Sequence, residues 1–237
     1  MLRSVLRGGV RVLGLETSSR RGTVALVEAG RVIVWAATEA PGGHAPHLLG
    51  LVNQVLADAG WSKTALDRVS VGTGPGSFTG IRVGIALAQG IALGLSRPLV
   101  GVGSLQAMSR AVPVGVHGPR CAFIDARRNE LFGAEYDEGG HERRAPEALR
   151  REDVGAWLAR TASPVVLGEV TSSLILPTSP LRSELTDLPH AVGVGLAGEE
   201  APEPPENAAP VEAVYVRPAD AIRPNLPGFP LSSSEPT

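Results

Sequence analysis

Short β-branched runs alternate along the first half of the chain with longer apolar segments whose spacing is helical. Strands are expected over residues 10–15, 22–28 and 31–37, and Ala29-Gly30 predicts a tight hairpin turn between the last two. The elements expected next are a helix over 46–59, strands over 69–71 and 99–102, and a helix over 104–111. This order predicts an α/β lobe that opens with a β-hairpin.

The second half repeats this order in weaker form from about Pro113. Strands are expected over 121–125, 130–136 and 165–167, a helix within 146–160, and an acidic, proline-rich loop over 200–209. Two similar halves favour an α/β, two-lobed actin-like (ASKHA, ribonuclease-H-like) fold with a reduced second lobe. The expected boundaries are 10–111 for the first lobe, 112–222 for the second, and disordered ends over 1–9 and 223–237.

Residues 73–84, TGPGSFTGIRVG, are the most distinctive segment of the chain. They predict a tight turn between a buried strand and a helix, with positive φ at Gly72, Gly74 and Gly76 and a helix cap from Ser77 or Thr79. Neither common phosphate motif fits. No Gly-Lys-Ser/Thr ends the turn, and Thr79 stands where a dinucleotide fingerprint needs glycine. A structural turn is therefore favoured over a phosphate loop.

The helix after this turn carries two stripes of small residues at a spacing of four. They are Gly80, Gly84 and Ala88 in one stripe, and Ala86, Gly90 and Gly94 in the other. Glycine inside a helix costs roughly 1 kcal/mol relative to alanine. Close packing on both sides would explain the cost, with the domain's own sheet on one side and a second subunit on the other. A membrane span fits less well, because Arg82 and Gln89 interrupt a run already short of roughly 20 residues.

Composition narrows the class of protein. The 237 residues are 43% hydrophobic but only 4% aromatic, so the core should be aliphatic. A net charge of −2 argues against strong free-standing affinity for nucleic acid. Cys121 is the single cysteine and excludes an intramolecular disulfide, which fits a reducing compartment; we expect it to be buried. The first nine residues lack the apolar core of a secretion signal.

Four stretches carry a resemblance to a known family. Residues 73–90 are similar to the hallmark segment of the TsaB family, and residues 12–33, VLGLETSSRRGTVALVEAGRVI, resemble its first hairpin. Residues 124–136 resemble the opening of its second lobe, and residues 210–218 resemble its closing Pro-x-Tyr-x-Arg element. The glycine-rich segment is the most specific of the four.

The resemblance implies a two-lobed fold and a role without catalysis. The chain would be a scaffold in threonylcarbamoylation of the adenosine beside the tRNA anticodon, and would heterodimerise with a catalytic TsaD-type subunit. A TsaE-type ATPase would join the complex, tRNA would be contacted indirectly, and ATP and a metal ion would be used by the complex. The family implies a cytoplasmic protein without a membrane, and the same surface could form a homodimer.

The expected partner interface combines the first small stripe with the helix over 46–59, as a helical bundle across two subunits. Its predicted residues are Gly76, Gly80, Gly84, Ala88, Leu48 and Val52. Glycine and alanine along this groove would admit close approach of a helix.

Glu16, Thr17 and Ser18 follow the first strand, where actin-like kinases place an Asp and then glycine and hydroxyl residues to hold magnesium and phosphate. Glu16 is longer than the Asp usual in kinases and in TsaB-like chains, and no glycine follows it. These three residues are weak nucleotide candidates, and a hydrogen-bonding role at the lobe hinge is favoured.

Two rival classes stay open: an autonomous ATP-dependent small-molecule kinase and a metallopeptidase. A kinase of this kind would need a glycine-rich loop to bind adenosine, and Gly193 and Gly195 match such a loop only poorly. The peptidase would want a His-x-x-x-His pair, but His44 and His47 are three apart. Asp125 with Arg127, and Tyr215 with Arg217, suggest turn and ion-pair residues rather than catalytic ones.

Overall fold

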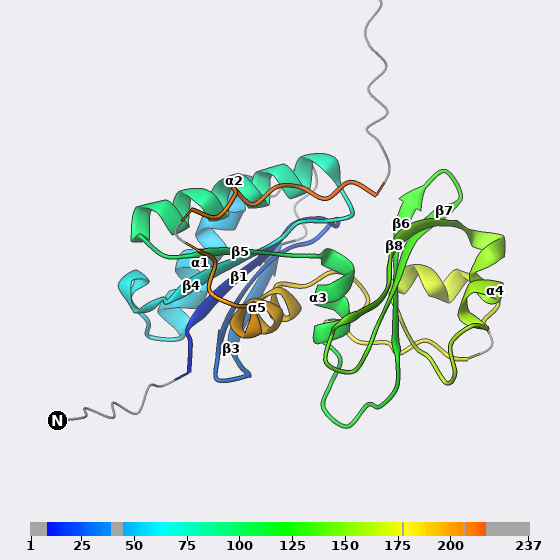
Figure 1. Cartoon of the computed structure of the whole chain (residues 1–237). Helices are drawn as coiled ribbons and strands as arrows, with labels where there is room; N and C mark the ends of the chain where they lie inside the picture. Colours follow the sequence, from blue (N-terminus) through cyan, green and yellow to red (C-terminus); the bar gives the residue numbers. More distant parts are fainter. Residues whose placement is uncertain (1–8, 39–44, 177, 206, 217–237) are drawn as a thin grey trace, which may run out of the picture.

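The computed structural model describes residues 9–38, 45–176, 178–205 and 207–216, and shows two lobes side by side, each built on its own β-sheet (Figure 1). The first sheet has the strand order β3-β2-β1-β4-β5. Its strands are β1 (Val12–Glu16), β2 (Gly22–Glu28), β3 (Arg31–Thr38), β4 (Arg68–Gly72) and β5 (Leu99–Val102). β1, β2 and β3 pair antiparallel, whereas β4 and β5 run parallel to β1. The predicted opening hairpin and the parallel strands after it are confirmed.

Helices cover both faces of this sheet. On one face α1 (Ala45–Asp58) and α2 (Phe78–Leu95) enclose the main core, which includes Leu13, Leu15, Val24 and Leu26. On the other face α5 (Ala191–Glu200) packs on β1, β2 and β4. Gly14 and Ala25 alternate with these core residues and meet α5, as the period of two along a strand requires. A short helix over Lys63–Ala65 precedes β4.

The second sheet has the order β8-β7-β6-β9. Its strands are β6 (Arg120–Arg127), β7 (Glu130–Tyr136), β8 (Glu142–Arg150) and β9 (Val165–Leu167). Helix α3 (Ser104–Arg110) covers one face through Leu105 and Met108, and α4 (Val154–Leu158) covers the other through Trp157 and Leu158. Short 3-10 turns run over Arg151–Asp153 and Glu169–Ser173. Cys121 is fully buried in this core, as predicted.

The structure corrects two predictions about the second half. The helix expected within 146–160 is confirmed only over residues 154–158, because residues 142–150 form the edge strand β8. Pairing with β7 overrides the local pattern there. The second sheet does follow the predicted boundary at residue 111. The predicted second lobe over 112–222 is too long, however, because α5 and residues 207–216 pack on the first lobe (Figure 1). The ends expected to be disordered lie outside the described residues, except Gly9.

Candidate functional site

The glycine turn joins β4 to α2. Gly74 and Gly76 have φ values of 101° and 154°, so two of the three predicted positive angles are confirmed. Gly72 does not share this property and is needed for space, since a Cβ there would lie 2.1 Å from Oε2 of Glu16. Ser77 caps α2 by accepting a hydrogen bond from the backbone N–H of Gly80 at 3.2 Å. The turn is thus rigidly packed against the end of β1.

The carboxyl group of Glu16 is completely buried at this junction. Its Oε1 accepts from the backbone N–H of Ser18 at 2.6 Å, and its Oε2 accepts from Oγ of Ser104 at 2.9 Å. Ser104 in turn donates its N–H to the carbonyl of Gly74 at 2.7 Å. Burial raises the pKa of Glu16 above its usual value, while the hydrogen bonds from Ser18 and Ser104 oppose that shift. Glu16 therefore links the first strand, the glycine turn and the start of α3.

Thr17 and Ser18 fill the space in front of helix α2. The N–H of Ser77 donates to the carbonyl oxygen of Ser18 at 2.6 Å, and Oγ1 of Thr17 donates to the carbonyl of Gly80 at 2.8 Å. A Cβ on Gly80 would lie 2.1 Å from the carbonyl oxygen of Thr17. A helix N-terminus binds a phosphate through its free N–H groups. Here one of those N–H groups, that of Ser77, already donates a hydrogen bond to the backbone carbonyl of Ser18.

The two small stripes of α2 face opposite environments, and the predicted interface residues belong to the inner one. The first stripe is buried within the chain itself: Gly80 and Gly84 pack on Thr17, and Ala88 is in the core. Leu48 and Val52 of α1 are 0% and 2% exposed, so both are buried in the core of the first lobe. Gly76 is half-buried against Ser18.

The second stripe is the exposed one. Ala86, Gly90 and Gly94 face solvent, and a Cβ added at either glycine would meet no atom within 4 Å. Leu93 beside them is 83% exposed. By length and composition α2 is apolar enough to cross a membrane, and two thirds of it is not buried within the structure, since the buried share is 33%. Because its inner face forms the core on β4 and β1, we interpret α2 as a domain helix with an uncovered apolar face.

Residues 208–216, the C-terminal strap, run along α2 (Figure 1). Val211 and Ala213 pack on the core of the first lobe, and the N–H of Val214 donates to the carbonyl of Thr73 at 2.8 Å. Oη of Tyr215 accepts from Nε of Arg82 at 3.1 Å, so Tyr215 is a packing and hydrogen-bonding residue. Its predicted companion Arg217 lies outside the described residues. The spacing of four between Phe78 and Arg82 was a signal for their contact, but nothing in the sequence placed Tyr215 beside them.

The other candidate residues are not assembled into a site. Gly193 and Gly195 lie inside α5, where a Cβ on Gly193 would be 1.8 Å from the carbonyl oxygen of Ala107, so they serve helix packing rather than an adenosine loop. His44 lies outside the described residues and His47 is exposed on α1. Asp125 accepts from the N–H of Arg127 at 3.0 Å, the turn role predicted for it. Within the described part of the chain, no group of three or more His, Cys, Asp or Glu could hold a metal ion.

Comparison with known proteins agrees with this architecture. Residues 38–154 match the family model described as TsaD, tRNA N6-adenosine threonylcarbamoyltransferase. The tRNA threonylcarbamoyladenosine biosynthesis protein TsaB of Escherichia coli is 38% identical over 134 residues, which are 55% of this chain and 58% of that protein. The chain thus spans about half the length of the curated relatives it matches.

Solved structures extend the similarity to the whole fold. A Pseudomonas aeruginosa protein described as similar to peptidase YeaZ superposes with a TM-score of 0.71 at 32% identity, covering 88% of this chain and all of that one. The ethanolamine utilization protein EutJ of Carboxydothermus hydrogenoformans has a TM-score of 0.52 at 12% identity over 83% of this chain and 92% of its own, which shows the shared actin-like fold alone. With the glycine turn, the two lobes and this coverage together, the chain belongs to the TsaB (YeaZ) family.

Proposed function

We propose that this chain acts in the biosynthesis of threonylcarbamoyladenosine on tRNA, as a non-catalytic subunit that holds a TsaD-type subunit in an active arrangement. The TsaD-type subunit would bind the metal ion and perform the transfer, a TsaE-type ATPase would use ATP, and tRNA would be reached through the complex in the cytoplasm. Family membership supports a role in threonylcarbamoyladenosine biosynthesis, because the E. coli relative is named for that process. The shared family model supports a partner built on the same fold.

The observation that carries the proposal is the uncovered face of α2. This helix is long and apolar enough to cross a membrane, and 33% of it is buried. Leu93, Ala86 and Gly90 present apolar or bare backbone surface to solvent. Exposed apolar surface of this kind favours a protein partner, and small residues allow that partner's backbone to approach closely.

The closed turn after β1 supports the absence of catalysis. An actin-like kinase needs space for phosphate between this turn and the helix that follows the glycine turn. Here the carbonyl of Ser18 accepts a hydrogen bond from the N–H of Ser77. The two carboxylate oxygens of Glu16 accept hydrogen bonds from the N–H of Ser18 and the hydroxyl of Ser104. A magnesium-bound phosphate would have to displace these bonds. The single chain is therefore better suited to binding than to phosphoryl transfer.

Depletion of the protein in its host tests the pathway. We expect threonylcarbamoyladenosine to disappear from bulk tRNA, as measured by nucleoside mass spectrometry, and to return with the wild-type protein. Unchanged modification after depletion would contradict the proposal.

Binding and activity of the purified chain test the division of labour. Leu93→Asp should leave the fold intact and abolish binding of the TsaD-type subunit of the same organism, whereas Val114→Asp, at another fully exposed apolar residue, should bind normally. The chain alone should neither hydrolyse ATP appreciably nor modify tRNA. A turnover near about 10 per second that is lost in Glu16→Gln would show an enzyme instead.

A further inference from the structure

The two lobes touch through helices α3 and α5, which lie side by side between the sheets (Figure 1). Leu105 and Met108 fix α3 to the second sheet, whereas α5 packs under the first sheet. Where the helices meet, a Cβ on Gly193 would lie 1.8 Å from the carbonyl oxygen of Ala107, and Val194 packs beside it. Small side chains set the distance between two helices but interlock weakly, so one lobe can turn on the other about this contact.

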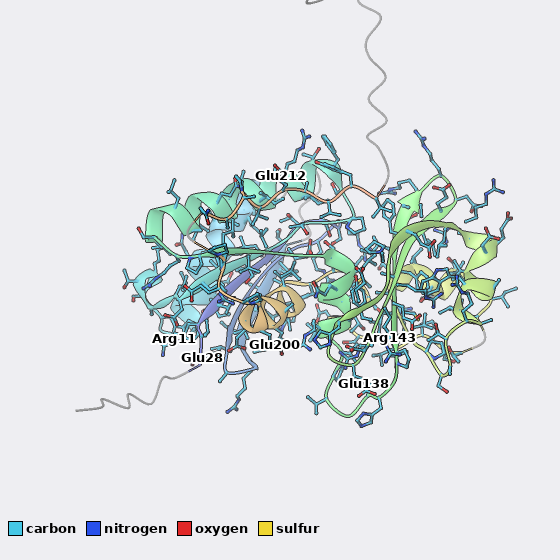
Figure 2. All side chains as sticks on the ribbon, viewed as in Figure 1. Arg11, Glu28, Glu138, Arg143, Glu200 and Glu212 are labelled. Carbon is cyan, nitrogen blue, oxygen red and sulfur yellow. The ribbon has the colours of Figure 1, made fainter. Side chains whose placement is uncertain are left out.

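Ion pairs tie the lobes together at both ends of the α3–α5 contact. At the far end, Nη2 of Arg110, the last residue of α3, donates to the carboxylate of Glu200, the last residue of α5 (Figure 2). Nη1 of Arg110 also donates to the carbonyl of Gly139 at 2.5 Å, and Gly140 packs on its side chain, which is 15% exposed. The far pair is therefore held by packing as well as by charge.

The pair at the near end is more exposed. It joins Arg20, on the turn between β1 and β2, to Glu169, on the 3-10 turn that packs on β6. Nη1 of Arg20 donates to Oε1 and Nη2 donates to Oε2 at 2.8 Å, so the contact is a fork, and the two side chains are 58% and 35% exposed. Because Glu16, four residues earlier, bonds to Ser104 at the start of α3, this pair lies near the opposite end of the contact from Arg110.

The backbone of Glu169 is anchored beside the second sheet. Its N–H donates to the carbonyl of Asp187 at 2.8 Å. The preceding Gly168 has a φ of 110°, and a Cβ there would lie 2.2 Å from the carbonyl oxygen of Phe123 on β6. The carboxylate of Glu169 therefore moves with the second lobe, whereas Arg20 moves with the first.

We propose that the Arg20–Glu169 pair is an electrostatic latch: when formed it holds the closed arrangement of the lobes seen here, and when broken it lets the second lobe turn about the α3–α5 contact. The neighbouring Arg21 contacts Glu184 at 3.3 Å, in the segment where the chain returns to the first lobe. An exposed ion pair shifts an equilibrium by about twofold to fivefold and weakens as salt is added. The angle between the lobes therefore depends on a weak, salt-sensitive contact. The inference concerns the chain alone and does not rest on the proposed function.

The distance between one labelled site on each lobe tests the latch in the full-length protein. Ala57→Cys on α1 and Ala148→Cys on β8 place the labels at exposed positions, and the natural Cys121 is buried. Single-molecule energy transfer should show one main distance in this doubly labelled parent. Glu169→Gln should raise the population of a second distance about twofold to fivefold. Salt at about 1 M should raise the same population in the parent, but not further in Glu169→Gln.

Three variants make the test specific to this pair. Arg20→Lys keeps the charge without the fork and should give an intermediate population. Glu169→Gln should have no further effect when it is added to Arg20→Gln, because its partner is already absent. Glu28→Gln is the matched control, since Glu28 pairs with Arg11 at 2.8 Å within the first lobe, at the edge away from the second (Figure 2). It should leave the distance unchanged.

The same distribution of distances in the parent and in Glu169→Gln, at low and at high salt, would overturn the latch. A second population that Glu28→Gln produces to the same extent would also overturn it, as would one that Glu169→Gln increases in the Arg20→Gln background. Melting temperatures close to that of the parent establish that the variants are folded, as expected for exposed positions. No partner is present in the experiment, so its outcome leaves the proposed function untouched.

Discussion

Helices α2 and α5 cover opposite faces of the same sheet, and both are rich in glycine. In α5 each glycine is matched by a close neighbour, since Cβ atoms on Gly193 and Gly198 would lie 1.8 Å from Ala107 and 1.9 Å from Ser70. In α2 only the inner pair, Gly80 and Gly84, is matched in this way, whereas the outer pair has no neighbour within 4 Å. The unfavourable helix propensity of a glycine is offset inside α5 by packing. No contact within the described chain offsets the same cost on the outside of α2.

The largest expected effect is at Gly193. Gly193→Ala places a methyl group against the carbonyl of Ala107, which belongs to the backbone of α3 and cannot move aside easily. We expect a loss of about 3 kcal/mol, the upper part of the usual range for overpacking. For a chain of this size that is a fall of about 6–12 °C in melting temperature. A melting temperature equal to that of the wild type would show that α5 is not packed as described.

Gly84→Ala should cost less, about 2 kcal/mol. The new methyl group would meet Oγ1 of Thr17, a side-chain atom that can rotate, at 2.2 Å, and the gain in helix propensity offsets part of the clash. The double variant with Thr17→Ser, which keeps the hydroxyl, should not recover stability, whereas that with Thr17→Ala should recover part of it. Thermal melts of the wild type, the three single variants and the two double variants measure this coupling.

The caps of the two helices should respond differently to pH. α2 is capped by Ser77, but α5 is capped by Nδ1 of His190, which accepts from the N–H of Val192 at 3.1 Å. Burial, with a smaller contribution from the charge of Arg21, lowers the pKa of His190 from 6.5 to about 4. The neutral imidazole is favoured by folding, so its contribution is complete above pH 6.5 and is lost as pH falls toward 4.

Because one pKa unit corresponds to about 1.4 kcal/mol, the loss of stability between pH 7.5 and 4.5 should be roughly 1–3 kcal/mol. Denaturant unfolding at pH 7.5, 5.5 and 4.5 would measure it against His190→Asn, which keeps a capping side chain without a titrating ring. A difference between the two proteins that stays constant with pH would contradict a neutral histidine cap.

The smallest effect should be a gain. Gly90→Ala adds a methyl group to open space on α2, so stability should rise by about 0.5–1 kcal/mol. Gly90→Leu should also leave the fold intact, yet reduce affinity for the TsaD-type subunit by blocking close approach. Normal partner binding in Gly90→Leu would mean that the outer stripe of α2 is not part of the interface.

The sequence predicted the elements whose patterns are local. Strand β5 over 99–102 and strand β7 over 130–136 have the expected bounds, and α1 is displaced by one residue. The edge strand β8 was missed because ERRAPEALR contains a proline and several charges, and it is a strand only through pairing with β7. Helix α5 was missed because its glycines weaken the helical signal, and their reason lies in contacts with residues such as Gly14, far away in the chain.

The candidate site divides in the same way. The turn, its cap and the hydrogen-bonding role of Glu16 follow from residue types next to one another in the sequence. The sequence does not show which stripe of α2 faces inward, because both stripes have the same spacing and consist of small residues. That choice depends on the carbonyl and hydroxyl of Thr17, which fit only glycine at positions 80 and 84.

The return of α5 to the first sheet has a consequence for how the chain acquires its structure. The underside of that sheet, with Gly14 and Ala25, stays bare until residues 191–200 have been made, after the whole of the second sheet. Contacts of such long range are slow to form, and a nascent first half exposes an apolar sheet face on the ribosome. We therefore expect no stable single-lobe fragment when the chain is cut between the sheets, because the fragment would lack α5.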